Sequence, residues 1–297
     1  MNRFMIGLHG GFDARKMERD YRDAFLGVEC CSFGSEEDTK RLLAEQRARG
    51  LRIGVHFPFR SGQSRIRDAL FLSQDCAVRE EAYALVQREL DYLTRVRPDY
   101  VLFHYPKPVL LDERVDWRLW HFADAAEYVN GSEYDRETLL VNSEALFQWL
   151  SERSAEYGFM PVLELDAIHP YIYETDLLEQ LLGRYGRIRL CLDTGRLHLQ
   201  ERMDARFSAR DILRKYSRWA EVIHLSTMKV TDRVEHNHYP ALPELDSEEG
   251  WAPIADYLTI VREENAEAKL LFEHRSELIG DDDLERCYRW VEKLMNG

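Results

Sequence analysis

The sequence predicts one eight-stranded α/β barrel, in which a helix follows each strand. Eight short apolar segments alternate with longer amphipathic, charged stretches along the 297 residues, as repeated strand–helix units require. No Pro-, Gly- or Ser-rich linker divides the chain, so we expect residues 1–297 to form one domain. A doubly wound sheet is the rival fold. The first strand lacks the glycine-rich phosphate loop of that fold, which counts against it and against a nucleotide cofactor.

The eight apolar segments have the length and the β-branched or aromatic content of buried strands. We expect strands at residues 4–9, 27–33, 52–57, 100–105, 160–166, 188–193, 221–226 and 269–274. Amphipathic segments between them predict helices at residues 13–25, 35–49, 74–96, 136–157, 175–182, 209–220, 251–265 and 282–295. Several of these helices have recognisable ends: Ser35 and Asp38 form a capping-box variant, and Gly50 and Gly158 follow predicted last turns.

Two connections are much longer than the others. Residues 106–135 are rich in aromatic side chains, and residues 227–250 carry His236 and His238. Long loops inside a compact domain are usually binding loops or lids. Because both connections follow strands, we expect them to lie over the C-terminal face of the barrel, where such folds carry their chemistry.

Composition excludes several classes of function. The formal net charge is -14, with 54 acidic and 40 basic side chains, which counts against a protein that binds nucleic acid through its phosphates. No apolar run is long enough to span a bilayer, so no membrane role is expected. The five cysteines form no two-residue-spaced pair and the N-terminus has no signal-peptide pattern. These features indicate reduced thiols and a cytoplasmic location.

Six predicted strands end in side chains of the kinds that bind metal ions. The carboxyl ends of barrel strands meet at one face, so these side chains are expected to lie together. They are His56, His104, Glu164, Asp193, His224 and Glu273. Strand side chains alternate, so Glu164 points inward together with Val162, and Asp193 together with Cys191. Each inward set is then apolar below and polar at the C-terminal end of the barrel.

The carboxylates of this set predict a cation site. Glu164, Asp193 and Glu273 near a barrel axis are costly unless they are paired or bound to metal, and His224 adds a nitrogen ligand. One such residue alone is more often an ordinary salt-bridge partner, but four consecutive strands supplying a ligand type favour metal. A mixed oxygen and nitrogen site suits Mn²⁺ or Zn²⁺, with Mg²⁺ or Co²⁺ as further candidates.

At these residues the sequence resembles the xylose-isomerase-like TIM barrels, which include sugar isomerases, sugar epimerases and endonuclease IV. The resemblance covers essentially the whole chain, and its specific part runs from Glu164 to Glu273. It implies a metal held by Glu164, Asp193, His224 and Glu273, and the stretch from Cys191 to Gly195 is similar to the family's motif on the sixth strand. It also implies a homodimer, since such acidic barrels commonly pair.

Further histidines resemble ligands that endonuclease-IV-like members use for additional metals. His56 and His104 each precede an aromatic residue and a proline, and His236 and His238 follow the seventh strand. The sequence departs from the family at Arg196, where a histidine often stands. A guanidinium does not bind metals, so Arg196 is interpreted either as a fork for a substrate phosphate or carboxylate or as a rim salt bridge. His104 and His238 are further candidates for binding substrate.

Three functions remain open. The resemblance implies foremost an isomerase or epimerase of carbohydrate metabolism that acts on a small polyhydroxy or sugar phosphate substrate. In it, Glu164 removes a proton beside the carbonyl, an enediolate forms and Glu273 returns the proton. The alternatives are an endonuclease-IV-like phosphodiesterase with several metals, and a non-catalytic barrel that binds sugar or metal. The presence of both Glu164 and Glu273 argues against the non-catalytic alternative.

Overall fold

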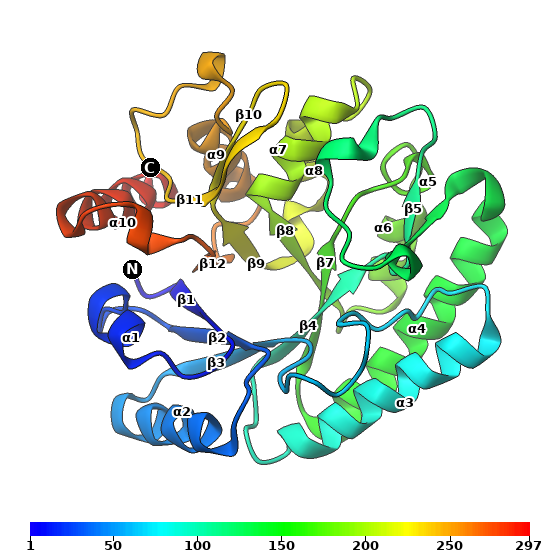
Figure 1. Cartoon of the computed structure of the whole chain (residues 1–297), viewed down its shortest axis with the longest axis horizontal. Coiled ribbons are helices and arrows are strands. Elements are labelled where there is room, and N and C mark those ends of the chain that lie inside the picture. Colours follow the sequence, from blue (N-terminus) through cyan, green and yellow to red (C-terminus); the bar gives the residue numbers. More distant parts are fainter.

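A computed structural model describes residues 1–297. Eight parallel strands form a closed barrel in the order β1-β12-β9-β8-β7-β4-β3-β2, and helices surround it (Figure 1). The predicted α/β barrel is confirmed, and each of the eight predicted strands is present. Their bounds are β1 Phe4–His9, β2 Gly27–Cys31, β3 Arg52–His56, β4 Tyr100–Tyr105, β7 Met160–Leu165, β8 Arg189–Asp193, β9 Ala220–Leu225 and β12 Lys269–Phe272.

Two apolar cores hold the barrel together. The smaller core fills the barrel interior with Met5, Tyr100, Leu102, Val162, Cys191, Val222 and Leu271. The larger core lies between the strands and the surrounding helices. The inward direction that the sequence predicts for Val162 and Cys191 is therefore correct. Since Glu164 and Asp193 follow two residues later on the same strands, the alternation of side chains carries them inward as well.

Ten helices accompany the strands. Their bounds are α1 Ala14–Asp20, α2 Glu36–Arg49, α3 Cys76–Leu93, α4 Arg136–Tyr157, α5 Pro170–Tyr173, α6 Leu177–Arg184, α7 Thr194–Met203, α8 Ala209–Tyr216, α9 Ile254–Glu264 and α10 Asp281–Asn296. None of the helices combines the length and the apolar character that crossing a membrane requires. Two helices are absent from the prediction, the four-residue α5 and the ten-residue α7. The sequence of α7 does not show a helical apolar stripe, because this helix also buries polar side chains such as His198 and Gln200.

Both long connections contain short strands that the sequence did not predict. In the first, β5 (Val109–Leu111) pairs with β6 (Tyr128–Asn130), and in the second, β10 (Thr227–Val230) pairs with β11 (Val234–Tyr239). β5 and β6 have three residues each, which is too few for a recognisable alternation, whereas β10 has four and β11 has six. Between β5 and β6, Trp120 and His121 line a cavity together with His104 of β4.

Gly54 in β3 makes room for the largest side chain in the barrel interior. A Cβ atom at Gly54 would lie 2.2 Å from Cζ of Tyr100, whose hydroxyl donates a 2.7 Å hydrogen bond to Glu29. We predict that Gly54→Ala destabilises the protein by about 1–3 kcal/mol through overpacking, measured by urea unfolding. The control is Gly183→Ala in α6, which meets no atom within 4 Å and should be neutral or slightly stabilising. Equal effects of the two substitutions would contradict this explanation.

Candidate functional site

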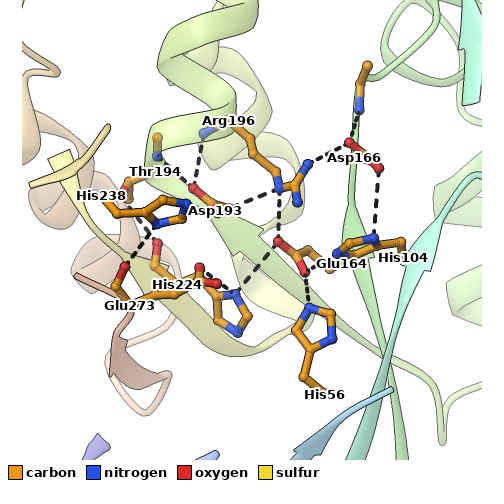
Figure 2. Close-up of polar contacts among 12 residues, drawn as sticks. His56, His104, Glu164, Asp166, Asp193, Thr194, Arg196, His224, His238 and Glu273 are labelled. Carbon is orange, nitrogen blue, oxygen red and sulfur yellow. Dashed lines mark hydrogen bonds and ion pairs between the residues drawn. The ribbon is translucent and has the colours of Figure 1, made fainter. Parts of the chain in front are cut away.

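Strand register brings the polar side chains together at the carboxyl end of the barrel. His104 of β4 pairs with Glu164 of β7, and Asp193 of β8 pairs with His224 of β9. Glu273 follows β12, whose Leu271 is in register with His224. Figure 2 shows these side chains converging on one region between the strand ends.

Glu164 lies at the centre of this region and is 1% exposed. Its Oε2 atom is 3.2 Å from Nε2 of His56 and 3.1 Å from Nε2 of His104. Its Oε1 atom faces the other way, 3.6 Å from Nδ1 of His224 and 3.2 Å from Nε of Arg196. The two oxygens of this one carboxylate therefore face two different groups of ligand-type side chains.

The first group consists of Asp193, His224 and Glu273, whose candidate ligand atoms lie within 4.8 Å of one another. Nδ1 of His224 is 3.1 Å from Oε2 of Glu273, yet both atoms are buried and make no hydrogen bond. The opposite ring nitrogen of His224 is 3.3 Å from Glu29. A histidine that donates one N–H to a carboxylate and presents its other nitrogen to acidic groups is arranged as metal-binding histidines are.

The second group consists of His56, His104 and Glu164, which are all buried. Nδ1 of His56 is 3.0 Å from the carbonyl oxygen of Phe57, and Nδ1 of His104 is 2.8 Å from Oδ2 of Asp68. Both partners are acceptors, so these nitrogens carry the protons of the neutral rings. The remaining lone pairs then point at Oε2 of Glu164, an arrangement that a cation between them, or protonated rings, would satisfy.

The residues present therefore fit a divalent ion. Asp193, His224, Glu273 and Glu164 provide three carboxylates and one imidazole, and the unbonded atoms of His224 and Glu273 face one another. Such a mixture of oxygen and nitrogen ligands suits Mn²⁺, Zn²⁺ or Co²⁺. His56 and His104 offer two more nitrogens on the far side of Glu164, so the same carboxylate has ligand groups on both sides.

Arg196 is the cation that the structure places among these carboxylates. Its Nη1 atom is 2.7 Å from Oδ1 of Asp166, and its Nε atom is 3.2 Å from Glu164 and 3.7 Å from Asp193. Arg196 therefore forms ion pairs inside the site and not on its rim, and its interpretation as a fork for a substrate anion stays a prediction. A metal ion at Glu164 and Asp193 would share these oxygens with the guanidinium.

The charges in the site shift the pKa values of the carboxyl groups in opposite directions. Burial and the neighbouring charge of Glu273 raise the pKa of Asp193. Burial acts on Asp166 in the same direction, but Arg196 and Lys107 outweigh it and lower the pKa of Asp166 to about 2. Asp166 is thus compensated by protein cations, whereas Asp193 lacks sufficient compensation.

Two predicted candidates lie at the edge of the site. His238 takes a left-handed backbone conformation, with φ 49, and its Nδ1 atom is 3.0 Å from the carbonyl oxygen of Glu273. It lines a cavity together with Asp193. His236 is exposed on β11 and stacks on Trp251 at 5.2 Å. The structure brings His236 into none of the clusters that could hold a metal ion.

The sequence analysis missed two charged residues of the site. Asp68 orients His104, and the Nζ atom of Lys107 is 2.9 Å from both Asp68 and Asp166. Lys107 stands three residues after His104 and directly after the proline of that motif. Its position just beyond the fourth strand could therefore have predicted a place near the site. Asp68 belongs to the connection between β3 and α3, and no pattern distinguishes it.

Comparisons with known proteins support the fold. No family model matches the sequence, and no curated protein matches it. The solved structures that superpose on it include a D-tagatose 3-epimerase-like protein, with a TM-score of 0.64, 13% identity and coverage of 99% of this chain and 97% of that chain. A D-psicose 3-epimerase with D-tagatose from Clostridium cellulolyticum H10 gives a TM-score of 0.61 at 12% identity, with 99% of each chain covered.

A third similar structure is the IOLI protein with a bound zinc atom. It gives a TM-score of 0.63 at 10% identity and covers 99% of this chain and 98% of that chain. A protein described as containing a xylose isomerase domain also matches, with a TM-score of 0.59 at 15% identity. The predicted resemblance to xylose-isomerase-like TIM barrels is therefore confirmed at the level of the fold, over essentially the whole chain.

Proposed function

We propose that the protein is a divalent-metal-dependent isomerase or epimerase that acts on a sugar or sugar phosphate through an enediolate. The observation that carries the proposal is the placement of two carboxylates around one histidine. Nδ1 of His224 lies 3.6 Å from Glu164 and 3.1 Å from Glu273. The similar solved structures, which include sugar epimerases, support the same class of reaction.

Glu164, Asp193, His224 and Glu273 would hold the ion, which would polarise the carbonyl group and stabilise negative charge on the neighbouring oxygens. Either glutamate can then act as the base that removes the proton from the carbon beside the carbonyl, and the other returns a proton. Glu273 is the more accessible of the two, with 34% of its side chain exposed against 1% for Glu164.

Exchange of a carbon-bound proton with solvent tests this chemistry directly. We expect the wild-type protein to introduce deuterium from D₂O beside the carbonyl of a ketose or ketose phosphate. Glu273→Gln should slow the exchange by at least about 100-fold, because a general base contributes that much. Mass spectrometry of the sugar gives the rate, and metal content is measured on the same samples.

The matched control for this experiment is Glu37→Gln, an exposed substitution on α2, which should leave the exchange unchanged. If none of the tested ketoses and ketose phosphates exchanges a carbon-bound proton in the presence of Mn²⁺, Co²⁺ or Zn²⁺, the isomerase proposal is wrong. If exchange occurs and Glu273→Gln retains it with the ion still bound, the assignment of Glu273 as a base is wrong.

Asp193 provides a test of metal binding that needs no substrate. Its Oδ1 atom caps α7 by accepting from the N–H groups of Gly195 and Arg196, and asparagine can cap a helix equally well. Burial and the charge of Glu273 raise the pKa of Asp193 in the folded protein. At a pH above about 4, the ordinary pKa of an aspartate, the unfolded chain ionises Asp193 more readily than the folded protein does, and this difference lowers folding stability. Without metal at pH 7 to 8, we expect Asp193→Asn to raise the midpoint of thermal unfolding.

The same variant should lose the stabilisation that metal confers on the wild type, because a neutral amide replaces a charged ligand. Thermal unfolding in EDTA and in Mn²⁺ or Zn²⁺ measures both effects. Asp13→Asn, at the exposed N-cap of α1, is the control and should change neither. An equal metal-induced shift in Asp193→Asn and in the wild type would remove Asp193 from the ligand set.

The second candidate function is phosphodiester hydrolysis, which the group formed by His56, His104 and Glu164 favours. These residues would hold a further metal ion, and bound metal ions would supply stabilisation of the attacking and the leaving oxygen in such a reaction. If this function holds, the wild type with Zn²⁺ hydrolyses a model phosphodiester, and His56→Ala abolishes hydrolysis whereas His236→Ala on exposed β11 retains it. Hydrolysis without sugar proton exchange would establish this candidate in place of the first.

A further inference from the structure

A cavity of about 270 Å³ adjoins the candidate metal site. Three basic side chains line it, from the β3–α3 connection, from the segment after β4 and from α7: Arg67, Lys107 and Arg196. The aromatic segment that contains Trp120 and His121 also lines it. These two residues and Arg196 equally line a second cavity of about 300 Å³, which Asp193 and His238 border. The two cavities therefore share Trp120, His121 and Arg196 as lining residues, and one of them borders Asp193.

The acidic groups in the wall of this cavity already have partners. Both oxygens of Asp68 are engaged, Oδ1 by Arg67 and Oδ2 by His104 and Lys107. Asp166 accepts from Arg196 through Oδ1 and pairs with Lys107 through Oδ2. Both carboxylates are nearly inaccessible, with 7% and 3% exposure. The third acid, Glu127, is also buried and lies 3.7 Å from Lys107.

The guanidinium groups, in contrast, keep unused donors. Arg196 donates through its backbone nitrogen and Nη1 and pairs through Nε, but Nη2 makes no hydrogen bond within the protein. Arg67 contacts Asp68 through Nε and His104 through Nη2, and its Nη1 makes no hydrogen bond. Their side chains are 29% and 43% exposed. Buried acids thus hold two partly exposed guanidiniums in place, and each has a terminal nitrogen without a protein partner.

A wall with free donors and engaged acceptors fits a ligand that is rich in acceptors. We propose that this cavity binds an anionic group, a phosphate or a carboxylate, through Arg67 and Arg196. Arginine pairs with such groups through short, charge-assisted hydrogen bonds. The inference rests on the proposed function in one respect: the anionic group belongs to the sugar whose carbonyl end lies at Asp193 and Glu273. It deepens that function by selecting an acidic or phosphorylated sugar as the substrate.

Binding of a simple anion tests the proposal without any turnover. Inorganic phosphate and acetate are titrated separately into metal-loaded protein by isothermal titration calorimetry. We expect saturable binding of one of them, and the tighter anion distinguishes a phosphate site from a carboxylate site. Arg67→Gln should weaken this binding by at least about tenfold, because it removes a charge-assisted donor, and Arg41→Gln on exposed α2 should leave it unchanged.

Arg67 pairs with Asp68 and not with the Asp193 group, so we expect Arg67→Gln to retain the metal ion of that group. Because Arg67 also contacts His104, the metal content of each variant is measured. Circular dichroism confirms that Arg67→Gln is folded. Absence of saturable anion binding, or equal binding by Arg67→Gln and the wild type, would overturn the proposal. Since anion binding requires no proton transfer, its outcome is separate from that of the deuterium exchange. Anion binding without exchange would retain this site and reject the isomerase function.

Discussion

The structure depends most on how it compensates the acidic side chains buried at the carboxyl end of its barrel. Ionised groups away from water are costly unless cations or hydrogen bonds compensate them. Lys107 and Arg196 compensate part of this charge through Asp68, Asp166 and Glu164. Glu273 and Nδ1 of His224 face one another without a hydrogen bond. A bound cation would complement these remaining groups, and the proposed function rests on such a cation.

The barrel provides the rigidity that such a site needs. The apolar layer inside the barrel lies directly below the site, since Val162 and Cys191 precede Glu164 and Asp193 by two residues on the same strands. Asp193 has a second role, because it caps α7 and thereby fixes the helix that carries Arg196. The position of Arg196 therefore depends on the same residue with which a metal ion would pair.

The fold could be predicted from the sequence because parallel barrel strands are short, buried and regularly spaced. The ligand-type residues could also be predicted, because chain topology alone brings all strand ends to one face. Helix α7 could not be predicted, since it buries His198 and Gln200 and has no apolar stripe. Asp68 could not be predicted either, because only the tertiary fold brings this loop residue to His104.

Arg196 illustrates the limit of reasoning from position along the chain. Its place three residues after Asp193 indicated a rim salt bridge or an anion fork, and the structure adds that it contacts Glu164 and Asp166. A one-dimensional pattern does not show which oxygens a long side chain reaches.

We propose that Glu164 joins the ligand groups on its two sides. Elemental mass spectrometry of tag-free wild type beside Glu164→Ala tests it: we predict at least one divalent ion per chain, lost in the variant, and an equal metal content in both proteins would contradict the claim.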